Sequence, residues 1–325
     1  MDIFNVPANP VIGVAWGAMA THDFMIGPRY RTLHYEFIAT AAAGKTITLA
    51  DVGGLINLKI NGKVQRAHLA TELDAIQTSY GVDFQANIYN YDGGAFTWVG
   101  GVRQGAQAAK QTMVQLTIYL EEPWRKSYAA QDSMAWFTSW ADGSVLKSLQ
   151  AELFIPAKSA NVDAGSAIVV NSFVRYDEAI GPLDSNKKPI ALVNKWERTQ
   201  WPYGGIGDLY IVNLNKRQLC EQISIFSPNA AGVYDAVSNV KVVRDGKTIR
   251  DVTRVRNDQG LLDHGFNEAG LTEDRFDVVF DESDLPSDGL VLEGARDFKI
   301  IPTVAVAGAA AKILTLISQT YGGID

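Results

Sequence analysis

Carboxylates are the side chains most able to do chemistry in this sequence, and they gather at two places. These are Glu121-Glu122 and the denser group Asp281-Glu282-Ser283-Asp284 with Asp288. Oxygen-rich clusters can hold Ca2+, but the spacing matches no EF-hand, and a solvated loop is the better interpretation. Paired carboxylates can also hydrolyse glycosidic bonds. Because neighbours on a strand point to opposite faces, neither adjacent pair is expected to act together as acid and nucleophile.

The other reactive residue types form no known constellation. The sequence has no serine nucleophile elbow, HExxH motif, P-loop or pair of cysteines. Cys220 is expected to be a small buried side chain, and the glycines of Gly204–Gly207 precede a strand, so they are interpreted as a turn. The four histidines are far apart and are expected on the surface or packed on strands: His22, His34, His68 and His264. We therefore predict no catalytic, cofactor-binding or metal-ligating residue, and no enzyme.

Tryptophans crowd the segment 124–140, which has the composition of a loop. Trp124, Trp136 and Trp140 could stack on sugar rings, but aromatic residues more often fill contacts between subunits. The sequence holds seven tryptophans, and a lone chain that exposed them would carry large apolar patches. The tryptophans therefore favour a protein that buries these side chains in contacts with other subunits.

A strand–turn–strand–helix unit over Leu55–Gly81 organises the elements around these residues. Alternating apolar side chains over Leu55–Ile60 predict a strand. Asn61-Gly62 supplies the positive φ angles of a tight turn, and Lys63–His68 is predicted to return as the second strand. Thr71 with Asp74 three residues later predicts the start of a helix.

The unit occurs twice in the sequence. Val240–Arg250 repeats the hairpin 184 positions later, with Asp245-Gly246 in place of Asn61-Gly62. Leu116–Glu122 (LTIYLEE) is echoed by Phe276–Glu282 (FDVVFDE) at an offset of 160. Coincidence is the alternative, because such turns are common. An offset near half of the chain length favours duplication of a whole domain.

Many short strands joined by long loops predict an all-β protein of two tandem antiparallel eight-stranded jelly rolls with short helices. The predicted parts are an extended N-terminal arm (residues 1–28), a first jelly roll (29–180) and a second (181–325). Ala179–Pro189 has the composition of a linker. Val82–Met113 and Arg256–Asp274 are interpreted as long loops, which in compact domains are usually functional or exposed.

Composition excludes several kinds of partner. A chain of 325 residues has room for two domains, and its net charge of −7 argues against direct contact with nucleic acid, because phosphate neutralisation needs clustered lysine and arginine. The N-terminal residues show no secretory signal, and no apolar run approaches the ~18 residues of a membrane span. We expect a chain that is made inside the cell and is either soluble or assembled into something larger.

The combination resembles the double jelly-roll major capsid proteins of tailless bacteriophages with an internal membrane, in particular the corticovirus-type coat protein. The segments that carry the resemblance cover most of the chain: YRTLHYEF (30–37), the unit over 55–81, LTIYLEEPW (116–124), ALVNKWERTQWPYGGIGDLYIVNL (191–214), KVVRDGKTIRDVT (241–253) and KILTLISQTYG (312–322). The family has no catalytic signature to compare. The Gly- and Trp-rich loops depart from it, so nothing carries over to them residue by residue.

The resemblance implies a viral structural protein of the virion, made in the host cytoplasm. It implies a homotrimer that forms a pseudo-hexameric tile of an icosahedral shell over an internal membrane, and three two-lobed chains would supply six lobes with threefold symmetry. The implied partners are neighbouring capsomers, minor capsid or vertex proteins and the internal lipid membrane, without nucleic acid. Some relatives hold structural Ca2+, which the sequence assigns to no residue here.

The two long loops, 82–113 and 256–274, are expected at the same end of their lobes, where they would form the outward-facing tower of the trimer. The arm, residues 1–28, is expected to lie low and to become ordered on assembly. Two other functions stay open. One is a tandem jelly-roll enzyme acting on glycans, an amidase or glycosidase, which needs converging carboxylates in a cleft. The other is a carbohydrate-binding adhesin or spike that uses the Trp-rich loop.

Overall fold

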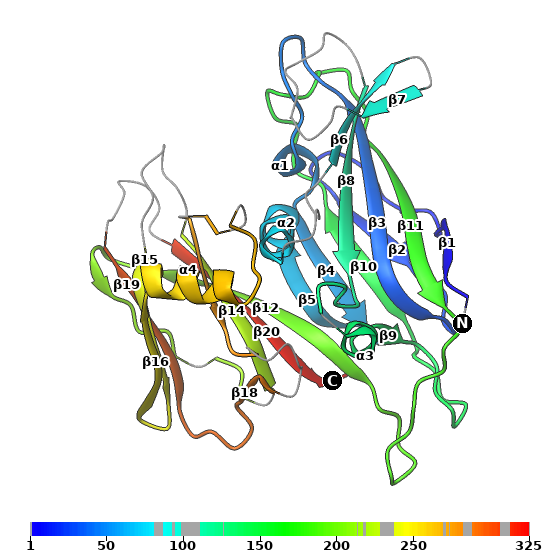
Figure 1. Cartoon of the computed structure of the whole chain (residues 1–325). Helices are drawn as coiled ribbons and strands as arrows, with labels where there is room; N and C mark the ends of the chain where they lie inside the picture. The colour runs from blue at the N-terminus through cyan, green and yellow to red at the C-terminus, as the bar shows by residue number, and fades with distance from the viewer. Residues whose placement is uncertain are drawn as a thin grey trace.

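In the computed structural model, β-strands form two lobes that lie side by side (Figure 1). The structure describes residues 2–80, 87–92, 95–98, 111–125, 127–212, 214–216, 219–227, 237–268, 271–272, 274–281, 288–305 and 313–324. Within these ranges the α-helices are short, and none has the length and apolar composition that a membrane crossing requires. The predicted all-β class with short helices is confirmed.

The first lobe is a sandwich of two facing sheets. One is a seven-stranded sheet with the order β1-β11-β3-β8-β6-β7, in which β9 also pairs with β3, and the other layer has the order β2-β10-β4-β5. The strands are β1 (Phe4–Pro7), β2 (Met19–Asp23), β3 (Arg29–Thr40), β4 (Leu55–Ile60), β5 (Lys63–Leu69), β8 (Gln111–Tyr119), β10 (Leu149–Phe154) and β11 (Val169–Asp177). Inward-facing residues of both sheets fill one core, among them Leu33 and Phe37 from one sheet and Leu58 and Ala151 from the other. Smaller elements join the lobe: α1 (Leu49–Val52), α2 (Ala70–Ser79), β6 (Asn87–Asp92), β7 (Ala95–Trp98), α3 (Tyr128–Ser133) and β9 (Trp136–Phe137).

The second lobe repeats this arrangement. Its sheets have the orders β12-β20-β14-β17 and β13-β19-β15-β16, and a second apolar core lies between them. The strands are β12 (Leu192–Pro202), β13 (Gly207–Asp208), β14 (Leu219–Phe226), β15 (Val237–Arg244), β16 (Lys247–Thr253), β17 (Arg275–Val279), β19 (Phe298–Val304) and β20 (Ile313–Gly323). The short β18 (Leu290–Val291) pairs with β14, and α4 (Arg254–Asp263) follows β16.

Both lobes have the strand order of a jelly roll, in which eight strands wind through two facing sheets. The hairpin β4–β5 matches β15–β16, and the helix that follows it, α2, matches α4. Asn61 and Gly62 have φ of 51° and 81°, and Asp245 and Gly246 have φ of 51° and 75°, as a tight hairpin turn requires. The sequence repeat therefore reflects two copies of one fold.

The lobes are joined along one sheet edge. Strand β12 of the second lobe pairs in parallel with β5 of the first at Trp196 and Arg66, so one sheet of each lobe continues into the other as a nine-stranded sheet. The chain passes from β11 to β12 through residues 178–191, which contain no strand. Edge pairing covers two sheet edges that would otherwise be unpaired.

The prediction of an extended N-terminal arm over residues 1–28 is wrong, because this segment contains the first two strands of the first jelly roll. Phe4–Pro7 pairs with β11, and Met19–Asp23 pairs with β10. The prolines that suggested an arm lie where they cost no ladder hydrogen bond, at the end of the edge strand β1 and in the connections. Ala20 and His22 are buried, so their alternation with exposed neighbours was the signal for a strand.

Two predicted loops also contain regular structure. Within Val82–Met113 the described residues form the hairpin β6–β7 and the first three residues of β8, while 82–86, 93–94 and 99–110 lie outside the described residues. Arg256–Asp274 contains most of α4. Helix α2 begins one residue before Thr71, and its first turn is capped by Glu72, whose carboxylate accepts from the backbone N–H of Leu69 at 2.8 Å.

Candidate functional site

A charged cluster centred on Arg125 lies where the two lobes meet. Arg125 follows β8 in the first lobe, and its side chain is 2% exposed. Its Nε donates to Glu122 Oε2 at 2.6 Å, and its Nη2 donates to Glu221 Oε1 at 3.0 Å. The same Nη2 lies 2.7 Å from Asp281 Oδ2. Because Glu221 (on β14) and Asp281 (after β17) belong to the second lobe, the guanidinium joins the lobes through buried ion pairs.

Two further side chains of the second lobe complete the cluster. The hydroxyl of Tyr321 donates to the carboxylate of Glu122 at 3.0 and 3.1 Å and also accepts from Arg125. The amide Nδ2 of Asn194 donates to Glu122 at 2.7 Å and to Glu221 at 3.1 Å. Charge-assisted hydrogen bonds of this kind are the strong ones in proteins, so the lobes are held by a hydrogen-bonded network.

Burial shifts the pKa values of the ionisable side chains in this cluster. Burial, together with the charges of Glu122 and Asp281, raises the pKa of Glu221 well above its usual range. Burial also raises the pKa of Asp281 to about 6, although Arg125 opposes the shift. For Arg125, burial lowers the pKa, but Glu122 and Glu221 outweigh it, so the pKa lies above its ordinary value. The shifts therefore favour the neutral form of Glu221, whereas Asp281, with a pKa of about 6, carries a negative charge at neutral pH.

A second buried cation, Arg66 on β5, lies beside the cluster. Its guanidinium is between the rings of Trp136 and Trp196, at 5.3 and 5.4 Å from their centroids. It donates to the backbone carbonyls of Asn194 at 2.9 Å and Tyr119 at 2.6 Å. Burial lowers the pKa of Arg66 to about 10, so the side chain stays charged at neutral pH.

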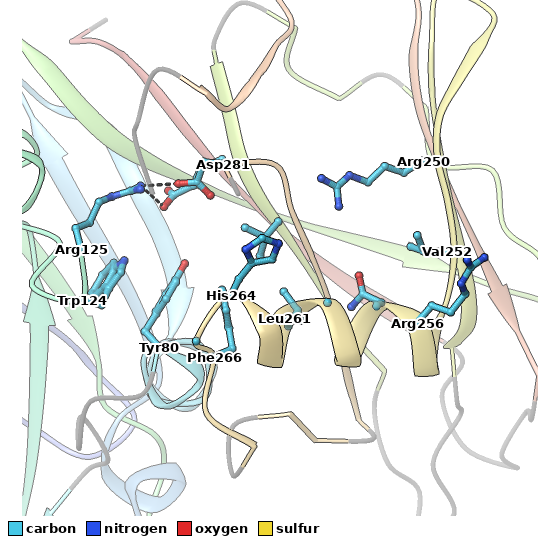
Figure 2. Close-up of a pocket in the computed structure, with 15 residues that line it drawn as sticks. Tyr80, Trp124, Arg125, Arg250, Val252, Arg256, Leu261, His264, Phe266 and Asp281 are labelled. Carbon is cyan, nitrogen blue, oxygen red and sulfur yellow. Dashed lines mark hydrogen bonds and ion pairs between the residues drawn. The ribbon is translucent and has the colours of Figure 1, made fainter. Parts of the chain in front are cut away.

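A cavity of about 340 Å³ opens beside this cluster, between the lobes. Figure 2 shows Tyr80, Trp124 and Arg125 at one end of the cavity and Arg250 and Arg256 at the other. The cavity is also lined by Glu221, Val252, Asn257, Gly260, Leu261, His264, Gly265, Phe266, Val279 and Asp281. Helix α4 contributes one wall, and the end of α2 contributes the facing one.

Glu121 belongs to a separate charged cluster within the first lobe. Its carboxylate accepts from Arg31 at 2.6 Å and from Arg175 at 3.1 Å, whereas Glu122 binds Arg125. Arg29 and Arg31 both donate to Asp177, at 2.6 and 2.7 Å. The neighbouring carboxylates therefore point into different clusters, as expected for adjacent residues.

The arrangement does not suit hydrolysis or metal binding. Glycoside hydrolysis needs two carboxyl groups on either side of the substrate, but Glu221 and Asp281 both bind the same nitrogen of Arg125. The guanidinium therefore occupies the space between them. Among the residues that the structure describes, no group of three or more histidine, cysteine or acidic side chains could hold a metal ion. Glu282–Asp284 lie outside the described residues.

The remaining residues singled out in the sequence lie apart. His22, His34 and His68 are on three strands of the first lobe, and His264 lines the interlobe cavity. Cys220 is buried, as expected, and burial raises the pKa of its thiol. Gly205 and Ile206 form a bend, and Gly207 is the first residue of the strand β13.

The tryptophans and Asp281 correct two predictions. Trp136 and Trp140 are buried within the first lobe, and Trp124 stacks on Tyr80 at 4.3 Å. They form no exposed platform, so they do not argue for a subunit contact. Asp281 is 7% exposed, so the interpretation as a solvated loop is wrong for this residue.

Sequence reasoning missed Arg66, Arg125 and Glu221. The sequence did contain a signal for two of them, because Arg66 and Glu221 are charged residues in the interior of strand-like segments, KVQRAHL and LCEQISIF. A charge at an inward-facing strand position requires a buried partner. Finding that partner requires the packing of the two lobes, which no local pattern contains.

Comparison with known proteins identifies the family. Residues 5–92 match the model of the viral coat protein P2 N-terminal domain, and residues 193–320 match that of the viral coat protein P2 C-terminal domain. A comparison with curated protein sequences found no match.

Solved structures agree with the fold. The major capsid protein P2 of bacteriophage PM2 is 12% identical, with a TM-score of 0.70 over 100% of this chain and 98% of that one. The STIV major capsid protein is 10% identical, with a TM-score of 0.71 over 100% and 97%. The capsid model of the virus PBCV-1 is 11% identical, with a TM-score of 0.63 over 98% and 93%. These likenesses confirm the double jelly roll, and the two domain matches, in chain order and covering most of the sequence, show that the chain belongs to the family of viral coat protein P2.

Proposed function

We propose that the protein is a major capsid protein whose homotrimer forms a pseudo-hexameric tile of an icosahedral shell. The observation that carries the proposal is the pair of lobes with one strand order, joined edge to edge through β5 and β12. Three such chains provide six similar lobes around a threefold axis, which approximates a hexagon. A coat protein has a structural role, so no catalytic site is required.

The two ends of the tile would serve different contacts. In each jelly roll the helix follows the second strand of the hairpin, so it lies at the end opposite the hairpin turn. Figure 1 shows α1, β6 and β7 together at the upper end of the first lobe. We assign this end to the outside of the shell, and the opposite end to the internal membrane and the minor capsid proteins.

Exposed apolar residues near residues 178–191 would contribute to the subunit contacts. Ile180, Ile190 and Leu192 are 62%, 43% and 38% exposed in the single chain. Burying apolar side chains of this size stabilises an interface by roughly 1.5–3 kcal/mol each when burial is complete. These residues therefore favour neighbouring copies or capsomers as partners over nucleic acid, which needs clustered positive charge.

The test is the mass of the purified protein in solution together with electron microscopy of its particles. Light scattering should give three times the chain mass of 35.4 kDa, and virions should be labelled by antibodies against this chain. A monomer across the micromolar range would contradict the tile. Hydrolysis of glycans or binding of sugars by the pure protein would instead support the enzyme or adhesin, for which the interlobe site offers no support.

A further inference from the structure

Two sheet edges that are covered at the junction of the lobes have open counterparts elsewhere in the chain. At the junction, β5 of the first lobe pairs with β12 of the second. The strand that corresponds to β5 in the second lobe is β16, and the strand that corresponds to β12 in the first lobe is β1. Among the described residues, β16 pairs only with β15, and β1 pairs only with β11. An unpaired edge presents its N–H and C=O groups to another strand, so each of these two edges can accept one.

The hairpins that contain β5 and β16 correspond residue by residue. Both have a register shift at the same place, which follows Leu58 in β4 and Val242 in β15. The cross-strand partners of these two residues are Arg66 and Arg250, and the sequence offset of 184 relates both pairs. Arg250 therefore occupies in β16 the position that Arg66 occupies in β5, where Arg66 is paired with Trp196 of β12.

The cross-strand partners in the other two sheets relate β1 to β12. The starting points are Tyr119 in LTIYLEE and Val279 in FDVVFDE, which are equivalent in the sequence repeat. The successive partners that lead from Tyr119 across the first sheet are Thr32, Arg175 and Asn5. The successive partners that lead from Val279 across the second sheet are Gln222, Gln319 and Trp196. Asn5 of β1 therefore corresponds to Trp196 of β12.

Strand β16 exposes positions that are buried in β5. Gln65 and Arg66 are 2% and 1% exposed, whereas Ile249, at the position of Gln65, is 40% exposed. His68 is buried as well, and Val252 at its position is only half-buried. Because β5 and β16 belong to the same hairpin of the same fold, the difference follows from the neighbour that β5 has and β16 lacks within the chain. Apolar surface of this kind favours a protein partner.

A hollow in the first lobe corresponds to the surface that receives the end of α2. Tyr80 caps the C-terminal end of α2, and its hydroxyl donates to Gln222 at 2.5 Å. The counterpart of Tyr80 is His264, which caps α4, and the counterpart of Gln222 is Thr32. Thr32 lies in a hollow of about 410 Å³ on the face of β1, β11, β3 and β8 that points away from the core. The hollow therefore lies where the end of α4 from another copy would come.

We propose that β16 of one copy pairs in parallel with β1 of a second copy, with Arg250 opposite Asn5 and the end of α4 at the hollow of the first lobe. The inference rests on the proposed trimer and names the surfaces that join its subunits. Figure 1 places β1 and β16 on opposite sides of the molecule, so one chain cannot join them. A head-to-tail contact of this kind can close into a ring, in which it would alternate with the β5–β12 junction. In the same register Lys247 lies opposite Asp2, so the contact brings opposite charges together.

The test joins the proposed neighbours by disulfides in the full-length protein. The first variant combines Asn5→Cys with Arg250→Cys. The second combines Asp2→Cys with Lys247→Cys, at two positions that are exposed in the single chain. Neighbouring strands lie about 4.8 Å apart, within the roughly 4.4–6.8 Å between Cα atoms that a disulfide spans. The matched control combines Asn5→Cys with Lys147→Cys, because Lys147 is exposed outside the proposed contact.

Light scattering gives the number of chains, circular dichroism the fold, and a denaturing gel without reductant the disulfides formed under mild oxidation. Cys220 is buried, so it should not take part. We expect both variants to be trimers that run on the gel as two and three linked chains, while the control runs as a single chain. If the protein is trimeric and neither pair links better than the control, the two edges do not meet, although the trimer stands. A monomer would overturn both the contact and the proposed tile.

Discussion

Replacing Arg125 with methionine should destabilise the protein strongly and in a pH-dependent manner. The substitution keeps a long apolar side chain but leaves Glu122 and Asp281 buried without their guanidinium partner. Two charges about 4 Å apart interact by ~4 kcal/mol at an effective dielectric constant near 20. Breaking buried pairs by removing one partner typically costs about 3–5 kcal/mol. We expect a loss of about 3–5 kcal/mol in the free energy of unfolding at pH 7.5.

Proton uptake should reduce this loss at lower pH. The pKa of Asp281 is about 6 in the folded chain, against an ordinary value of 3.8, and it should rise further once Arg125 is absent. A group whose pKa is raised on folding favours the folded state below that pKa and disfavours it above. The variant should therefore regain stability relative to the unmodified protein as the pH falls from 8 to 5.

The assay is urea unfolding followed by tryptophan fluorescence at pH 8, 7, 6 and 5, at one protein concentration because assembly adds to apparent stability. Glu221→Gln is the matched control. Because burial disfavours the charged form of Glu221, we expect glutamine at this position to change the free energy of unfolding by less than about 1 kcal/mol, as for a hydrogen bond that is largely retained. A loss under about 1 kcal/mol for Arg125→Met, a loss that does not vary with pH, or an equal effect of Glu221→Gln would refute the role assigned to the Arg125 ion pairs.

Three other outcomes follow from the structure. Burial lowers the pKa of His22 to about 4 and of His68 to about 3. Each histidine therefore contributes stability above pH 6.5 that is lost as the pH falls toward the folded pKa, by up to ~1.4 kcal/mol per pH unit. Replacing either histidine by glutamine should reduce the loss of unfolding free energy at acid pH. Gly62→Ala should cost about 1–2 kcal/mol in urea unfolding, because Gly62 has a φ of 81°. The double variant Ile180→Asp and Ile190→Asp should reduce the trimer fraction in light scattering while leaving the fold unchanged by circular dichroism, and a full trimer would exclude these residues from the interface.

The sequence predicted the fold well wherever local pattern decides the structure. The turns at Asn61-Gly62 and Asp245-Gly246 need φ angles that few residues adopt, so the hairpins and the repeat could be found without coordinates. The prediction failed at residues 1–28, because the prolines were given more weight than the short alternation of buried and exposed residues around Ala20 and His22. It also failed at α4, where a polar helix lacks the apolar stripe that usually identifies one.

The interlobe cluster could not be predicted, because its members lie up to 199 positions apart, as for Glu122 and Tyr321. Each carboxylate alone looks like an ordinary surface residue, and buried ion pairs depend on geometry more than on composition. Asp281 illustrates this point, because its acidic neighbours suggested solvent exposure although the side chain binds Arg125. A single charged residue in an otherwise apolar strand, such as Glu221, is the indication of a buried ion pair that a sequence can offer.

Divergence between the two copies of the fold explains where the cavity comes from. Helices α2 and α4 occupy the same place in their lobes, yet α2 buries seven of its residues and α4 buries only Asn257 and Leu261 among those described. Glu72 of α2 accepts hydrogen bonds from Arg198 of β12 at 2.9 and 3.0 Å, so this helix is fixed against the second lobe. Helix α4 instead leaves a face with Gly260 open toward the first lobe. The looser packing of α4 therefore accounts for the cavity between the lobes.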